Sequence, residues 1–159
     1  MKTIQLHQFI QKHHYALVEL IAFVFVLLFV FAAVAKLLEG DRFFNNLNNS
    51  PLLPDKAVPV VLSWAIPILE IVVAILIAWP KTRLKGLYSA LILSILFAIY
   101  TSGIVFFSPY TPCSCGGIIT LLSWPQHLML NIGLILLAIT GIRLYRKRSL
   151  FDTYTVLTS

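Results

Sequence analysis

The chain has 159 residues, of which 59% are hydrophobic and only 11% are charged. Soluble domains usually carry about 25% charged residues, so this composition excludes an ordinary soluble domain and indicates an integral membrane protein in contact with the lipid bilayer. The net charge is +6, but no stretch combines basic and aromatic residues as nucleic-acid-binding surfaces do. We therefore expect no nucleic-acid partner and attribute the positive charge to contact with anionic lipid.

Four apolar segments are long enough to cross a bilayer, since about 20 helical residues span ~30 Å of hydrocarbon. Backbone groups in lipid must form their hydrogen bonds within the segment, so each segment is predicted to be an α-helix. The expected helices cover residues 16–38, 57–79, 86–107 and 124–142. The predicted fold class is all-α, an integral membrane four-helix bundle over residues 16–142, with an N-terminal segment 1–15 and a basic tail 143–159.

The positions of lysine and arginine predict the orientation of the bundle, because these residues stay preferentially in the cytoplasm when they lie near helix ends. Nine of them fall before the first helix, between the second and third, or after the fourth. These nine are Lys2, Lys12, Lys81, Arg83, Lys85, Arg143, Arg146, Lys147 and Arg148. The segment 39–56 carries charges of both signs and the segment 108–123 carries none. We therefore predict an N-in/C-in arrangement, with residues 1–15 and 143–159 in the cytoplasm and the other two segments outside it.

The first outer segment, residues 39–56, is rich in asparagine, serine and proline. These residues favour turns, so the segment is predicted to be a loop that lies over the outer mouth of the bundle. Phe43 and Phe44 are expected at the membrane interface within it.

Two ionisable residues, Lys36 and Glu70, fall inside predicted membrane helices, where an unpaired charge costs a few kcal/mol and a functional role is a natural hypothesis. Glu70 lies about 13 residues, or ~20 Å, into the second helix. Two interpretations stay open for it: handling of a proton or positioning of a ligand, or a protonated group that only joins helices by hydrogen bonds. Lys36 is near the outer end of the first helix, where the sequence favours an anchor beside Glu39. Glu19 is interpreted as an interfacial charge without a functional role.

The fourth helix is predicted to begin at Ser123 with Pro125 in its first turn, a pattern typical of helix N-termini. His127 and Asn131 follow with a spacing of four residues, so both are expected on one face of this helix, just beneath the segment that holds the cysteines. His127 is a candidate to lower a thiol pKa or to move a proton. The alternative is an interfacial histidine that binds a loop carbonyl group.

The only two cysteines of the chain, Cys113 and Cys115, are separated by one residue in the second outer segment. A disulfide between them would close a very small ring, and strained disulfides are easily reduced and therefore oxidising. A structural disulfide that only stiffens the segment is the main alternative. Two thiolates and His127 supply at most three ligands for a metal, so no metal site is predicted.

A family resemblance rests on four groups of residues taken together. They are Ala35-Lys36-Leu37, Ile66-Pro67-Ile68-Leu69-Glu70, Cys113-Ser114-Cys115-Gly116-Gly117 and Asn131-Ile132-Gly133-Leu134. In order and spacing they resemble the MauE family of the DoxX-like four-helix membrane proteins, over residues 15–142. The resemblance implies a multi-pass protein of the bacterial cytoplasmic (inner) membrane, in a family named for a member needed to mature a disulfide-rich enzyme subunit. In architecture the chain also resembles four-helix thiol oxidoreductases that use a quinone, such as vitamin K epoxide reductase.

Two functional hypotheses follow from the sequence. In the first, Cys113 and Cys115 form a redox pair that exchanges disulfides with a periplasmic thioredoxin-like or client protein. His127 tunes a thiolate there, Lys36, Glu70 and Asn131 shape the bundle interior, and a membrane quinone is the candidate cofactor. The chain has no second cysteine pair to relay electrons. In the second hypothesis the protein is a non-catalytic accessory subunit or assembly factor of a larger envelope membrane complex, and the disulfide is structural.

Overall fold

The computed structural model describes residues 2–50, 53, 57–107 and 123–157, and within them the side chains of residues 15–147. The described chain is helical and contains no strand. Its helices are α1 (Lys2–Leu38), α2 (Gly40–Asn48), α3 (Ala57–Ala78), α4 (Arg83–Phe107) and α5 (Trp124–Leu157).

Four of these helices contain stretches long and apolar enough to cross a membrane: Tyr15–Leu38, Ala57–Ala78, Arg83–Phe107 and Trp124–Lys147. The predicted all-α membrane fold with four spanning helices is therefore confirmed. The helices α1 and α5 extend further than the apolar segments do, to Lys2 and Leu157. Neither extension contains glycine or proline, the residues that most disfavour a helix, so the backbone continues where the hydrophobic stretch ends.

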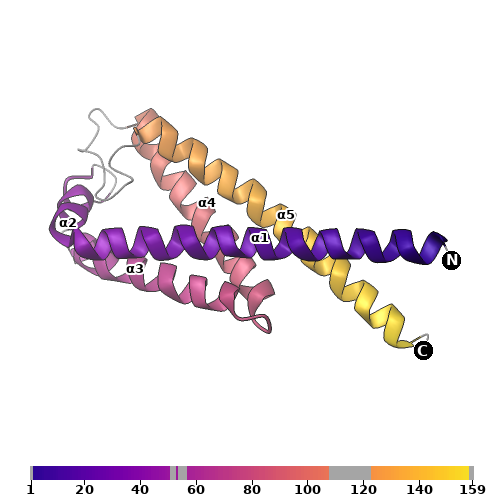
Figure 1. The fold of residues 1–159 in the computed structure, drawn as a ribbon. Helices are drawn as coiled ribbons and strands as arrows, with labels where there is room; N and C mark the ends of the chain where they lie inside the picture. The colour runs from indigo at the N-terminus through magenta and orange to yellow at the C-terminus, as the bar shows by residue number, and fades with distance from the viewer. Residues whose placement is uncertain (1, 51–52, 54–56, 108–122, 158–159) are drawn as a thin grey trace.

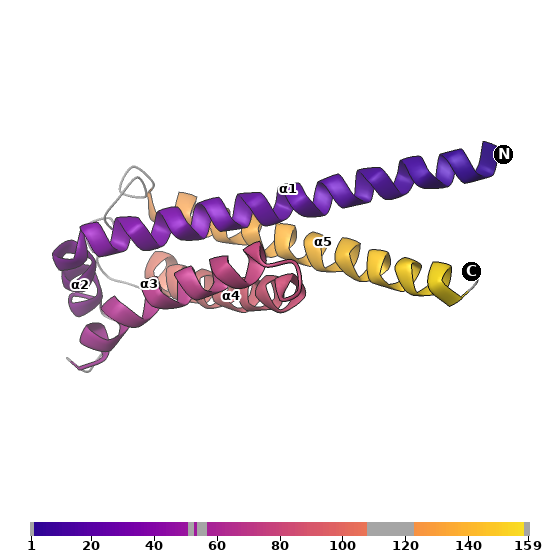
Figure 2. The same cartoon turned by 60° about the horizontal axis from the view of Figure 1, so that its bottom comes forward.

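The four long helices are arranged in a ring (Figures 1 and 2). Helix α1 packs against α3 and α5, and α4 packs against the same two helices from the opposite side. The α3–α4 turn lies at one end of the bundle, which we call the turn end, and beyond it α1 and α5 project toward the chain termini. At the other end, which we call the α2 end, α1 and α4 finish and α3 and α5 begin.

The bundle core consists of aliphatic and phenylalanine side chains supplied by all four long helices. Its buried members are Ile21, Ala22, Phe25, Phe29, Val73, Ala74, Ile77, Leu87, Ala90, Leu93, Ala138 and Ile142. Helices α3 and α4 approach most closely at Gly86, where an added Cβ atom would lie 2.6 Å from the backbone nitrogen of Ile77. Large apolar side chains such as Phe23 and Trp64 point outward, as expected for surfaces that contact lipid.

The segment predicted to be an outer loop is in fact partly helical, because Gly40–Asn48 form α2. Phe43 and Leu47 are one turn apart and both are buried, while Asn45 and Asn48 on the other face are exposed. The high asparagine content makes this amphipathic pattern hard to recognise in the sequence. A helix this short would be marginal alone, and packing of its apolar face against the bundle stabilises it. Phe43 packs inside the protein and is only 6% exposed, while its expected position at the membrane interface stays a prediction.

Candidate functional site

An ion pair between Lys36 and Glu70 lies inside the bundle and joins α1 to α3. The Lys36 Nζ atom is 2.7 Å from Oε1 of Glu70, and the two side chains are 15% and 1% exposed. A side chain on a helix leans toward the helix N-terminus, which directs Lys36 away from the end of α1 and into the bundle. The interpretation of Lys36 as an anchor beside Glu39 is therefore wrong, and the residue is a partner of Glu70.

Two aromatic rings flank the Lys36 ammonium group. Nζ is 5.8 Å from the ring centre of Phe43 on α2 and 5.7 Å from that of Phe97 on α4. Nζ also donates a longer hydrogen bond, 3.5 Å, to the carbonyl oxygen of Ala32. A cation attracted to the face of an aromatic ring gains about 0.5–2 kcal/mol, depending on how far it is desolvated. The ammonium thus contacts residues of α1, α2, α3 and α4 at one point of the fold.

The hydrogen bonding of this interior region is incomplete among the described residues. The second carboxylate oxygen of Glu70, Oε2, is buried and accepts no hydrogen bond from them. The Ser94 hydroxyl on α4 is in the same situation, three residues from Phe97 and therefore on the same side of that helix. Glu70 is 13 residues from the first residue of α3, and Ser94 is 13 residues from the last residue of α4. Each unsatisfied group therefore lies roughly 20 Å along its own helix from the terminus at the α2 end.

The start of α5 supplies the other two polar residues identified in the sequence. Asn131 is buried and His127, one turn earlier, is half-buried, so both face the protein as their spacing predicts. The His127 ring lies 6.4 Å from that of Trp124. The Gln126 side chain accepts a hydrogen bond of 2.8 Å from the Ser123 backbone, which satisfies one of the free N–H groups at the beginning of the helix.

Cys113 and Cys115 lie outside the described residues, so their distance from His127 stays a prediction. The described residues that precede and follow them are Phe107 and Ser123. Phe107 is the last residue of α4 and Ser123 precedes α5, so both lie at the α2 end of the bundle. Lys36, in the last turn of α1, lies toward the same end.

Comparison with known protein families shows which family the chain belongs to. The family model described as "Methylamine utilisation protein MauE" matches residues 14–144. The chain belongs to the MauE family. The matched region of this MauE protein contains all six residues singled out in the sequence: Lys36, Glu70, Cys113, Cys115, His127 and Asn131. No curated protein and no solved structure matches the chain.

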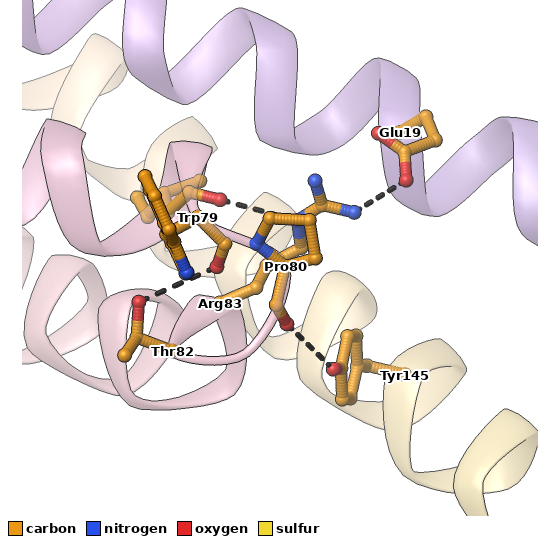
Figure 3. Close-up of polar contacts among 7 residues, drawn as sticks. Glu19, Trp79, Pro80, Thr82, Arg83 and Tyr145 are labelled. Carbon is orange, nitrogen blue, oxygen red and sulfur yellow. Dashed lines mark hydrogen bonds and ion pairs between the residues drawn. The ribbon is translucent and has the colours of Figure 1, made fainter.

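A second interhelical ion pair in this MauE protein, at the turn end, was not predicted from the sequence (Figure 3). The Arg83 guanidinium is bonded to the Glu19 carboxylate of α1 through one terminal nitrogen. Its Nε atom donates a hydrogen bond of 3.1 Å to the carbonyl oxygen of Ile77 at the end of α3. The sequence alone indicates only a cytoplasmic cation at Arg83 and an interfacial charge at Glu19. Their opposite charges at the same expected boundary were the available signal.

Further hydrogen bonds fix the α3–α4 turn itself (Figure 3). The Thr82 hydroxyl is 2.9 Å from the carbonyl oxygen of Leu76. It is also 3.3 Å from the carbonyl oxygen of Trp79, the contact drawn in Figure 3. The Tyr145 hydroxyl of α5 donates to the carbonyl oxygen of Pro80 at 3.2 Å. Together with the Glu19–Arg83 pair, these bonds join all four long helices at the turn end. The bundle therefore has a set of polar interhelical contacts at this end as well as near α2.

Proposed function

We propose that this MauE protein supports the maturation of exported proteins by thiol–disulfide exchange through Cys113 and Cys115. The observation that carries the proposal is the family match over residues 14–144, a range that includes both cysteines and the buried Lys36–Glu70 pair. A buried ion pair is a costly way to join helices, because apolar residues of similar volume often stabilise as well or better. The position of this pair near the α2 end therefore favours a functional role for these two residues over a purely structural one.

The proposed location is the cytoplasmic membrane of a bacterium, with the α2 end toward the periplasm. Support comes from the positive residues Lys81 and Lys85 at the turn end and Arg146 and Lys147 at the far end of α5, because such residues are retained in the cytoplasm. This orientation puts the cysteine-bearing segment in a compartment where disulfides persist.

The proposed reaction has two steps that balance in electrons and protons. A client dithiol first attacks the Cys113–Cys115 disulfide, so that the client gains a disulfide and the two cysteines become thiols. The two thiols are then reoxidised by a membrane quinone, which takes up two electrons and two protons to become a quinol as the S–S bond forms again. His127 is the candidate group to accept a thiol proton. The client is a periplasmic thioredoxin-like protein or a protein under maturation.

Trapping of a mixed disulfide tests this function. The variant Cys115→Ser leaves the Cys113 thiolate without its internal partner. When this thiolate attacks the disulfide of an oxidised client, in the reverse of the exchange, one client sulfur leaves as a thiolate and the other stays bonded to Cys113. No neighbouring cysteine of this protein can resolve that mixed disulfide, so the attached client should be identified by mass spectrometry. The reciprocal Cys113→Ser variant shows which thiol faces the client, and the double serine variant is the matched control. In cells that carry the double serine variant, we expect a smaller fraction of the client molecules to contain their disulfide. Unchanged client oxidation in those cells would contradict the proposal.

A second function is favoured by the surface at the end of α4, where Phe106 and Phe107 are 71% and 82% exposed. As an accessory subunit or assembly factor, the protein would dock this aromatic surface on another envelope protein, and the disulfide would only stiffen the adjoining segment. Stoichiometric retention in a large native complex, together with full function of the double serine variant, would favour this alternative.

A further inference from the structure

The Lys36–Glu70 pair retains unused hydrogen-bonding capacity of both kinds. An ammonium group has three donors, and Nζ of Lys36 uses two of them, one on Oε1 of Glu70 at 2.7 Å and one, weakly, on the Ala32 carbonyl oxygen at 3.5 Å. Oε2 of Glu70 is an acceptor that no described residue satisfies. A donor and an acceptor therefore lie side by side in an apolar interior, where leaving a polar group without a hydrogen-bond partner is unfavourable.

The walls around this pair restrict the kind of molecule that could satisfy it. The rings of Phe43 and Phe97 stand within 6 Å of Nζ, and flat aromatic surfaces favour a flat ring as a neighbour. The two charges of the pair cancel, so the site favours a neutral ligand over an anion or a cation. Lys36 remains 15% exposed, so its ammonium group is reachable from outside the bundle, whereas Oε2 of Glu70 is buried behind it. These features describe a neutral, planar, lipid-soluble molecule with oxygen atoms on its ring.

We propose that Lys36 and Glu70 bind the head group of a membrane quinone. A carbonyl oxygen of the oxidised ring would accept a hydrogen bond from Nζ of Lys36, and a hydroxyl group of the reduced ring would donate one to Oε2 of Glu70. A site with a single kind of group would favour one redox form, whereas this pair can bind both. Phe97 and Phe43 supply the apolar surface for the ring, and the Ser94 hydroxyl, on the same side of α4 as Phe97, is a further unsatisfied polar group for a second ring oxygen.

The inference rests on the proposed function, which is what requires a quinone. The chain contains only two cysteines, and they release two electrons each time their disulfide forms again. An external two-electron acceptor is therefore required, and a quinone accepts two electrons and two protons. Binding itself requires neither cysteine. The two ideas can therefore fail separately.

Photolabelling of the purified full-length protein in lipid nanodiscs tests the inference directly. The probe is a short-chain azido-ubiquinone, and mass spectrometry of the labelled peptides locates the adduct. We expect labelling of α3 around Glu70 or of α4 around Phe97, and competition by unlabelled short-chain ubiquinone and ubiquinol. Adducts confined to lipid-facing residues, unaffected by competitor, would overturn the proposal without any variant being needed.

Paired variants add a quantitative test by calorimetric titration with short-chain ubiquinone. The double variant Lys36→Met/Glu70→Leu removes both charges together, and we expect its affinity for the quinone to fall at least tenfold. The control Glu19→Gln breaks the other interhelical ion pair, at the turn end, and should leave the affinity within twofold of the unmodified protein. Equal affinity of the double variant and the unmodified protein would refute the site.

The same titration on the double serine variant of Cys113 and Cys115 separates the site from the function. Normal quinone binding by that variant, combined with no client trapped by either single-serine variant, would leave the quinone site standing and reject thiol–disulfide exchange. A client trapped by a single-serine variant, combined with no quinone binding by the unmodified protein, would do the opposite.

Discussion

Removal of the positive partner from the buried ion pair should strongly destabilise the bundle. The substitution Lys36→Met keeps a long flexible side chain but leaves the Glu70 carboxylate without its hydrogen-bond donor. Glu70 is 1% exposed, and no described residue is bonded to its other oxygen. The uncompensated group therefore has no access to solvent in the folded protein.

The structure predicts an ordered series of stability losses. Lys36→Met should lower the free energy of unfolding by about 3–5 kcal/mol, the usual cost of leaving one partner of a buried pair alone. Glu70→Gln keeps an acceptor for Lys36, which is 15% exposed, so the loss should be smaller, about 1.5–3 kcal/mol, the size of a charged hydrogen bond. The double variant Lys36→Met/Glu70→Leu should fall within about 1 kcal/mol of the unmodified protein, because apolar replacement of a buried pair is often neutral.

Unfolding of the purified variants in mixed detergent micelles, followed by tryptophan fluorescence as the denaturing detergent is increased, measures these differences. The order of the three variants is the decisive result, since it does not depend on the absolute stability. If the double variant lost as much as Lys36→Met, or if Glu70→Gln lost more than Lys36→Met, the energetic argument for a buried, mutually dependent pair would be refuted.

Three further substitutions test the packing at the turn end by the same assay. Gly86→Val should destabilise by at least 1–3 kcal/mol, the usual range for overpacking, because its Cβ would stand 2.6 Å from a backbone atom of α3; a loss under half a kcal/mol would show that α3 and α4 are less close. Arg83→Met leaves the Ile77 carbonyl oxygen without its donor and should cost about 1–3 kcal/mol, whereas no change would mean that the Glu19 pair is dispensable. Tyr145→Phe removes one exposed hydrogen bond to Pro80 and should cost no more than about 1 kcal/mol, so a larger loss would indicate a role that the geometry does not reveal.

The number and class of the membrane helices could be read from the sequence because they depend on hydrophobic length alone. Helix α2 could not, because its asparagines favour turns and only the contact of Phe43 and Leu47 with the bundle stabilises the helical form. Tertiary packing decided the structure of that segment over its local preference.

The sequence identified Lys36 and Glu70 as candidate site residues, but it did not predict that they form an ion pair. Lys36 and Glu70 stand out as charges in apolar segments, yet their contact depends on how α1 is rotated and shifted against α3. Hydrophobic periodicity is weak in helices that are apolar on all sides, so neither quantity can be read from the sequence. Arg83 was missed for a related reason: its charge fits a cytoplasmic loop, while its burial depends on the Ile77 carbonyl oxygen left free at the end of α3.

The ion pairs of α1 have a consequence for the order in which the chain is assembled in the membrane. Glu19 and Lys36 both lie on the first spanning helix, and their partners, Arg83 and Glu70, belong to helices synthesised later. During synthesis α1 therefore reaches the bilayer with two charges that have no partner yet. Both lie within five residues of an end of the span Tyr15–Leu38, where a charged side chain costs less than at the bilayer centre. The first helix gains these two contacts only after α3 and the start of α4 have joined it, so more than half of the chain must be made before both ion pairs can form.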